Sequence, residues 1–123
     1  TPLYSSAASD VYKRQELRHL HPETFEERGP RTTVTLDGSP VDNLNELECV
    51  DGHVYANVWM SEEILRIDPE SGEVTAVIDT TNLNHRPYDD PNAVLNGIAH
   101  IPGTDEFWIT GKLWDDLYRV RFE

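Results

Sequence analysis

The stretch that decides the fold runs from residue 44 to residue 69 and reads LNELECVDGHVYANVWMSEEILRIDP. It predicts three short strands separated by two turns, because apolar and polar residues alternate between turn signals. The pair Asp51-Gly52 is one such signal, since Asp-Gly favours a tight hairpin turn. Asn45 and Asn57 also lie on these strands, where a plain β-meander does not need polar groups. The stretch therefore indicates strands that carry polar side chains for a further purpose.

The rest of the chain from Leu17 onward continues the pattern of short strands and turns. Asp37-Gly38 predicts a second tight hairpin turn, and no segment holds a helical period longer than about two turns. The longest loop is expected at 80–94. Strands are expected at 17–20, 32–36, 46–50, 54–59, 64–67, 73–79, 97–101, 106–110 and 117–122.

An internal repeat organises these strands. LRHLHPETFE at 17–26 aligns with LRIDPESGE at 65–73, and LYRVRF at 117–122 is a weaker third copy. Pro22 and Pro69 are 47 positions apart (69 − 22), which fits the period of β-propeller blades made of four antiparallel strands. At roughly 45 residues per blade, the chain holds about two and a half blades. Since a propeller closes with four or more blades, we predict an all-β, partial propeller from a longer protein.

The first fifteen residues, TPLYSSAASDVYKRQ, do not share this pattern. They are rich in Ser and Ala, and LYSSAASDVYKRQ resembles a translated adapter sequence. We expect 1–15 to be a foreign or disordered segment and 16–123 to be the propeller part.

Composition excludes several kinds of partner. The net charge is −13, from 23 acidic residues against 10 Lys and Arg, so phosphates of nucleic acids and anionic membrane surfaces are not expected ligands. No run of 18 apolar residues is present that could form a transmembrane helix. The one cysteine, Cys49, excludes an intrachain disulfide, and its apolar strand pattern predicts a small buried hydrophobe.

Five motifs in order carry a resemblance to a known family. LNELE at 44–48, GHVYANVW at 52–59, LRIDP at 65–69, LNGIAH at 95–100 and TGKLW at 110–114 resemble the plant and bacterial glutamine cyclotransferases. The resemblance covers 17–123 and implies the C-terminal half of a five-bladed β-propeller. It also implies an acyltransferase that converts N-terminal glutamine of peptides to pyroglutamate and releases ammonia, without metal or cofactor. The family is often exported, so it further implies a periplasmic or secreted location.

Three residues match pocket positions of that family. The resemblance implies that Asn45 binds the substrate carboxamide or its oxyanion, Trp59 forms an apolar wall, and Lys112 supplies positive charge and relays protons. Without the resemblance, Asn45 would be read as a backbone-satisfying turn residue, Trp59 as core and Lys112 as a solvated strand-end charge. The family's main acid/base glutamate is expected outside this chain, so we expect an inactive fragment. Met60 after Trp59 and Asp115 after KLW depart from the family pattern.

Two other functions stay open from the residues. One is a non-catalytic propeller scaffold that binds a partner through its blades. The other is a calcium-dependent, lactonase-like hydrolase on a six-bladed propeller, which would need oxygen ligands converging on a central ion. The five histidines show no zinc-site spacing, so no metal is expected.

Overall fold

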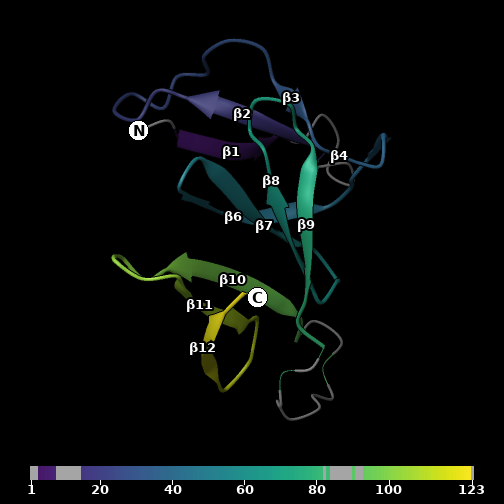
Figure 1. The fold of residues 1–123 in the computed structure, drawn as a ribbon, viewed down its shortest axis with the longest axis vertical. Helices are drawn as coiled ribbons and strands as arrows, with labels where there is room; N and C mark the ends of the chain where they lie inside the picture. Colours follow the sequence, from purple (N-terminus) through teal and green to yellow (C-terminus); the bar gives the residue numbers. More distant parts are fainter. Residues whose placement is uncertain (1–2, 8–14, 82, 84–89, 91–92, 123) are drawn as a thin grey trace.

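The computed structural model describes residues 3–7, 15–81, 83, 90 and 93–122 (Figure 1). Every regular element among these residues is a β-strand, and none forms a helix long and apolar enough to cross a membrane. The prediction of an all-β fold is therefore confirmed. The strands are β1 (Leu3–Ala7), β2 (Glu16–Leu20), β3 (Thr32–Thr33), β4 (Thr35–Leu36), β5 (Ser39–Pro40), β6 (Leu44–Val50), β7 (His53–Val58), β8 (Glu63–Ile67), β9 (Val74–Asp79), β10 (Leu95–His100), β11 (Glu106–Gly111) and β12 (Leu117–Arg121).

The strands form three main antiparallel sheets that lie one above the other in Figure 1. The central sheet has the order β6-β7-β8-β9, and β1-β2-β3 and β10-β11-β12 flank it; β4 and β5 form a separate hairpin. Strand β6, the first strand of the central sheet, contacts both β1 and β10 and so meets both neighbouring sheets. We call β6 and β10, which contact each other across the two sheets, the inner strands. This arrangement supports the prediction of repeated antiparallel units.

Strand β8 of the central sheet is buried on both faces, which explains its sequence. Leu65 and Ile67 of β8 pack with Leu17 of β2 and Val34 in one cluster, whereas Ile64 of β8 packs with a second cluster from β10 and β11. Strands buried on both faces read as continuous apolar runs, and Ile64-Leu65 is such a run. The burial of these side chains is the main force that holds adjacent sheets together.

The two predicted hairpin turns are confirmed. Asp37 and Gly38 have φ of 51° and 83°, and Asp51 and Gly52 have 50° and 78°. A two-residue hairpin turn with positive φ at both central positions matches the twist of the strands, and Asp-Gly tolerates this conformation. These turns connect β4 to β5 and β6 to β7.

Two expectations differ from the structure, and a third falls largely outside the described residues. The expected strand 32–36 is interrupted at Val34, whose N–H donates to the carbonyl of Gln15 rather than to a strand partner. Cys49 is exposed, so the prediction of a buried cysteine is wrong; it lies two residues from the turn at the end of β6, beyond the core clusters. Most of the expected loop 80–94 lies outside the described residues.

The segment 1–15 contains a strand that we did not predict. Leu3–Ala7 forms β1, which pairs antiparallel with β2 over its whole length. Residues 8–14 lie outside the described residues. The foreign origin of 1–15 and the boundary at residue 16 remain predictions.

Candidate functional site

Two matching β-bulges build the candidate site. Between the pairs Leu44↔Val58 and Leu47↔Ala56, β6 advances by three residues (47 − 44) while β7 advances by two (58 − 56). Strands β10 and β11 show the same shift between Leu95 and Ile98. A bulge places one extra residue in a strand and re-aims side chains, and bulges are frequent next to active sites.

Each bulge holds an asparagine, and the two asparagines meet. Asn45 in the β6 bulge donates from Nδ2 to Oδ1 of Asn96 in the β10 bulge, at 3.1 Å. The residues are 51 positions apart and both are half-buried. The contact therefore joins the starts of the inner strands of two neighbouring sheets.

A buried amide supports the second bulge. Oδ1 of Asn57, in β7, accepts a 2.9 Å hydrogen bond from the backbone N–H of Gly97. Asn57 is fully buried, and its Nδ2 has no hydrogen-bond partner among the described residues. Gly97 has φ of 139°, and a Cβ there would lie 3.0 Å from Cγ2 of Thr110. Because φ and space both disfavour a side chain, glycine is required at this bulge.

Trp59 and Lys112 occupy equivalent positions in consecutive sheets. Trp59 directly follows β7 and donates its N–H to the carbonyl of Asn43, just before β6, at 2.8 Å. Lys112 directly follows β11 and donates its N–H to the carbonyl of Val94, just before β10, also at 2.8 Å. Both are followed by a residue with positive φ, Met60 or Leu113. The repeat thus extends to the strand ends that carry both residues.

The structure places the three predicted pocket residues at one end of two sheets. Asn45 lies in a bulge and contacts Asn96, while Trp59 is 49% exposed and Lys112 is exposed. Trp59 is therefore not a buried core residue, which the sequence would have predicted if the family resemblance were left aside. Exposed side chains at these positions are available to a substrate or to a further part of the protein.

Other polar residues of the motifs have structural contacts. Oε2 of Glu48 accepts a 2.9 Å hydrogen bond from the backbone N–H of His100, which ties β6 to β10 farther along the strands. Trp114 packs on Tyr118 edge to face and donates from Nε1 to the carbonyl of Ala93 at 3.2 Å. Glu48 and Trp114 therefore join sheets and position loops.

From the sequence, Asn57, Asn96 and Gly97 were named within motifs, but no pocket role was predicted for them. The structure places all three in a hydrogen-bonded group with Asn45. A signal was present in the sequence, since Leu-Asn at 44–45 recurs at 95–96 at the start of an inner strand. Alignment of these two pairs would have placed the start of the expected strand 97–101 at Leu95, where the structure has it.

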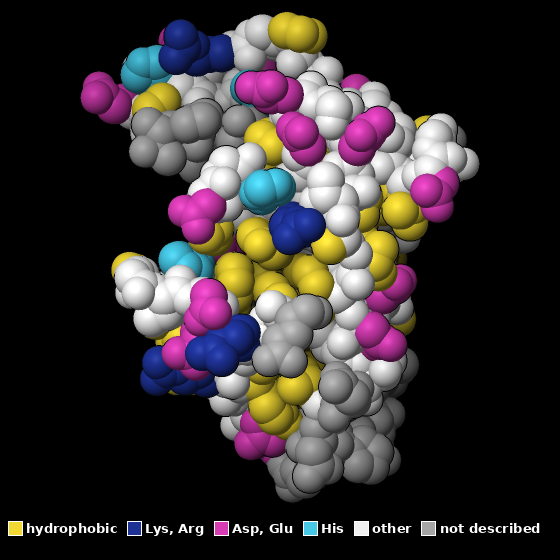
Figure 2. Space-filling view, viewed as in Figure 1, with side chains coloured by type: hydrophobic (Ala, Val, Ile, Leu, Met, Phe, Trp, Pro, Cys, Tyr) yellow, Lys and Arg dark blue, Asp and Glu magenta, His cyan; other side chains and the backbone are white. Residues whose placement is uncertain are grey.

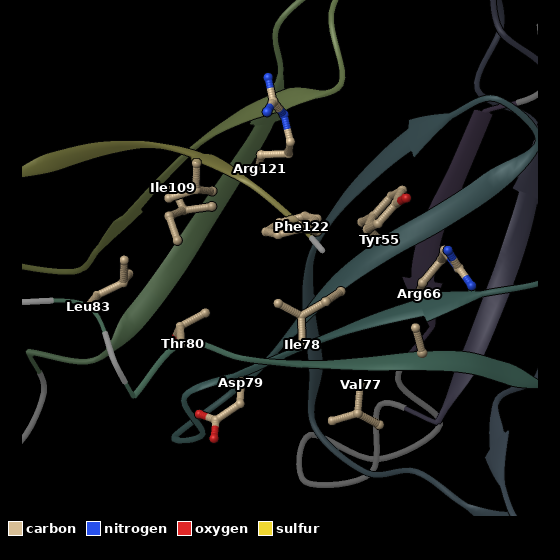
Figure 3. Close-up of a pocket in the computed structure, with 12 residues that line it drawn as sticks. Tyr55, Arg66, Val77, Ile78, Asp79, Thr80, Leu83, Ile109, Arg121 and Phe122 are labelled. Carbon is tan, nitrogen blue, oxygen red and sulfur yellow. The ribbon is translucent and has the colours of Figure 1, made fainter.

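A cleft between the central sheet and the β10-β11-β12 sheet lies apart from this group (Figure 3). Its volume is about 450 Å³, and apolar side chains such as Ile78, Leu83 and Phe122 line it together with Asp79. In Figure 2, hydrophobic side chains gather on the middle of the molecule, with basic, acidic and histidine side chains around them. Neither Asn45, Trp59 nor Lys112 lines the cleft. Among the described residues, no group of three His, Cys, Asp or Glu side chains is arranged to hold a metal ion.

Repeated antiparallel sheets, joined through asparagines at the same end of their inner strands, define an all-β protein of repeated sheet units. A family model described as glutamine cyclotransferase matches residues 9–122, and the chain therefore belongs to this family. It is similar to glutaminyl-peptide cyclotransferase from Arabidopsis thaliana, with 38% identity over an alignment of 97 residues; the match covers 73% of this chain and 29% of the relative.

A solved structure gives the same assignment. Glutaminyl cyclase from Myxococcus xanthus matches with a TM-score of 0.82 and 37% sequence identity. The match covers 98% of this chain and 55% of the Myxococcus chain. The present chain thus spans less than a third of the Arabidopsis relative and about half of the Myxococcus structure.

Proposed function

We propose that this chain is the C-terminal part of a glutaminyl-peptide cyclotransferase with a five-bladed propeller, which acts on peptides with N-terminal glutamine. The α-amine attacks the carbon of the glutamine side-chain carboxamide and forms the new C–N bond. The amine loses a proton, the carboxamide nitrogen gains one, and ammonia leaves. An enzyme of this kind belongs to the acyltransferases and is here proposed to work without metal or cofactor.

The observation that carries the proposal is the joint placement of Asn45, Trp59 and Lys112 at one end of two sheets. Attack on an amide builds negative charge on its oxygen, and a placed N–H donor or a cation stabilises that charge. Asn45 and Lys112 have these properties, and Trp59 offers an apolar surface for the glutamine stem.

We further propose that catalysis needs a part of the protein that this chain does not include. The chain spans about half of the Myxococcus structure, and the main acid/base glutamate is expected in the other part. The isolated chain should release little or no ammonia from a glutamine-initiated dipeptide, whereas the complete reading frame should turn it over.

The site is tested in the complete protein by Asn45→Leu and Lys112→Met. Loss of one oxyanion donor costs roughly 10²–10³ in kcat, so we expect a loss of this order for each. Arg28→Met is the matched control for Lys112→Met, because Arg28 is an exposed cation in the β2–β3 connection. Absence of turnover by the unmutated complete protein would overturn the proposal and favour a binding scaffold; equal losses in Lys112→Met and Arg28→Met would overturn the role of Lys112.

A further inference from the structure

We propose that Asn57 and Asn96 are positioning residues that set the orientation of Asn45 through the two bulges. The inference rests on the proposed function, because the orientation of Asn45 matters only if this side chain meets the substrate. A positioning role for Asn57 or Asn96 was not predicted from the sequence.

The first step is the contact between the two amides. An asparagine side chain can rotate about χ2, and its amide plane decides where its donor hydrogens point. The bond from Nδ2 of Asn45 to Oδ1 of Asn96 uses one of the two hydrogens on that nitrogen and fixes this plane. The amide of Asn45 is thereby held in one orientation, which a group that meets an oxyanion needs.

The second step is the support of Asn96. Its position depends on the bulge that it shares with Gly97, and the backbone of that bulge is held by Oδ1 of Asn57. Asn57 itself cannot move freely, because it is fully buried within β7 of the central sheet. The bond crosses from the central sheet to β10, so it also fixes one bulge relative to the other.

The third step is the cost of keeping Asn57. A buried amide nitrogen without a partner costs about 1–3 kcal/mol, and Nδ2 of Asn57 is such a group within the described part of the chain. An apolar residue of similar size, such as leucine, would avoid that cost. A polar residue retained at a destabilising position is more readily explained by the bulge that it holds than by stability.

The test is side-chain amide NMR on the ¹⁵N-labelled chain, with the Asn45 signal assigned by its loss in Asn45→Asp. A hydrogen bond is worth about 0.5–1.5 kcal/mol net, so Asn96→Leu should speed hydrogen exchange at the Asn45 amide roughly twofold to tenfold. Asn96→Asp keeps an acceptor oxygen and should restore slow exchange. Asn57→Leu should change the backbone amide of Gly97 and the side-chain amide of Asn45 together.

Thr75→Val is the matched control, because it removes a side-chain hydrogen bond between strands, from Nε of Arg66 at 2.9 Å, away from the bulges. It should leave the Asn45 amide unchanged. An Asn45 amide that Asn96→Leu does not affect would overturn the proposal, as would an Asn57→Leu effect confined to Gly97.

A kinetic measurement on the complete protein separates positioning from a structural role. Asn96→Leu should lower kcat about tenfold with KM within about twofold, and Asn96→Asp should recover most of kcat. If the NMR results hold but the complete protein releases no ammonia, the proposed function fails and the positioning stands. If ammonia is released but hydrogen exchange at the Asn45 amide does not change in Asn96→Leu, the positioning role is overturned and the proposed function stands.

Discussion

At the residue scale, local hydrogen bonds change the acidity of one carboxylate at the cleft. The backbone N–H of Thr81 donates to Oδ1 of Asp79 at 2.9 Å, and with the Thr81 hydroxyl it lowers the pKa of Asp79 below the usual value. Thr81→Val keeps the backbone bond and removes the hydroxyl, so the pKa should rise part of the way back. The measurement is a carboxyl ¹³C NMR titration of both proteins.

The sign of the effect on stability follows from that shift. Because the folded state lowers the pKa of Asp79, its contribution is present above the unfolded pKa and is lost as pH falls through the folded pKa. The contribution of Asp79 should therefore be absent only under strongly acidic conditions. An unchanged titration of Asp79 in Thr81→Val would contradict the role of the hydroxyl.

Core burial at single positions decides the stability of the central sheet. Ile67 is fully buried among residues of two sheets, whereas Val77 on β9 is 43% exposed. Ile67→Ala should lower the free energy of unfolding by about 2–5 kcal/mol, because it removes packed methyl groups and leaves a cavity. Val77→Ala should cost much less. Urea unfolding checks both, and similar losses would contradict the packing described for β8.

At the scale of elements, one glycine joins two sheets. Gly72 accepts a 2.9 Å hydrogen bond from the N–H of Thr35, and a Cβ at Gly72 would lie 2.0 Å from the carbonyl oxygen of Thr33. Gly72→Ala should lower the free energy of unfolding by roughly 3 kcal/mol or more. Positive φ alone costs an alanine about 1–2 kcal/mol, and the clash of its Cβ with the backbone adds to this. Gly52→Ala is the matched control.

The control isolates the clash from the backbone conformation. Gly52 has the same φ as Gly72, 78°, but a Cβ there would meet nothing within 4 Å. Gly52→Ala should therefore lose only the conformational part. Equal losses of stability in thermal unfolding of the two variants would show that the contact with Thr33 is not tight.

The local sequence pattern was enough to predict most strands and both Asp-Gly turns, because the alternation of apolar and polar residues and the preference of turn residues depend on only a few neighbouring positions. Strand β5 was missed, since Ser39-Pro40 offers no apolar alternation. The interruption at Val34 was missed because it depends on a bond to Gln15, 19 positions away (34 − 15). Asn45 was proposed as a pocket residue through its motif, and that role stays a prediction. Its contact with Asn96 depends on how two sheets stack, which the periodicity of the sequence does not contain.

At the scale of the whole molecule, β12 is an edge strand that pairs with β11 alone among the described residues. Strand β12 ends its sheet, and Leu117 is 59% exposed, whereas its counterpart in the repeat, Ile64 of β8, is fully buried beside β9. Open strand edges with apolar side chains pair with other chains. The isolated chain should therefore self-associate with rising concentration in sedimentation velocity, and Leu117→Lys should reduce this association.

Leu113→Lys provides the comparison for that edge. The exposed fraction of Leu113 is 58%, nearly the same as that of Leu117. Leu113 lies in the turn after β11, however, and not on the edge of a strand. It should change the association less than Leu117→Lys. If both variants act alike, general surface hydrophobicity rather than the edge of β12 drives the association.

The equivalence of Trp59 and Lys112 has a consequence for how such a protein can diversify. The same backbone position, held by the same N–H to carbonyl bond, carries an indole in one unit and an ammonium group in the next. The backbone bond is thus the same in both units, and the side chain at that position differs. In the proposed site, exchange of this one side chain would alter the contact with substrate while the hydrogen bond that holds its backbone stays in place.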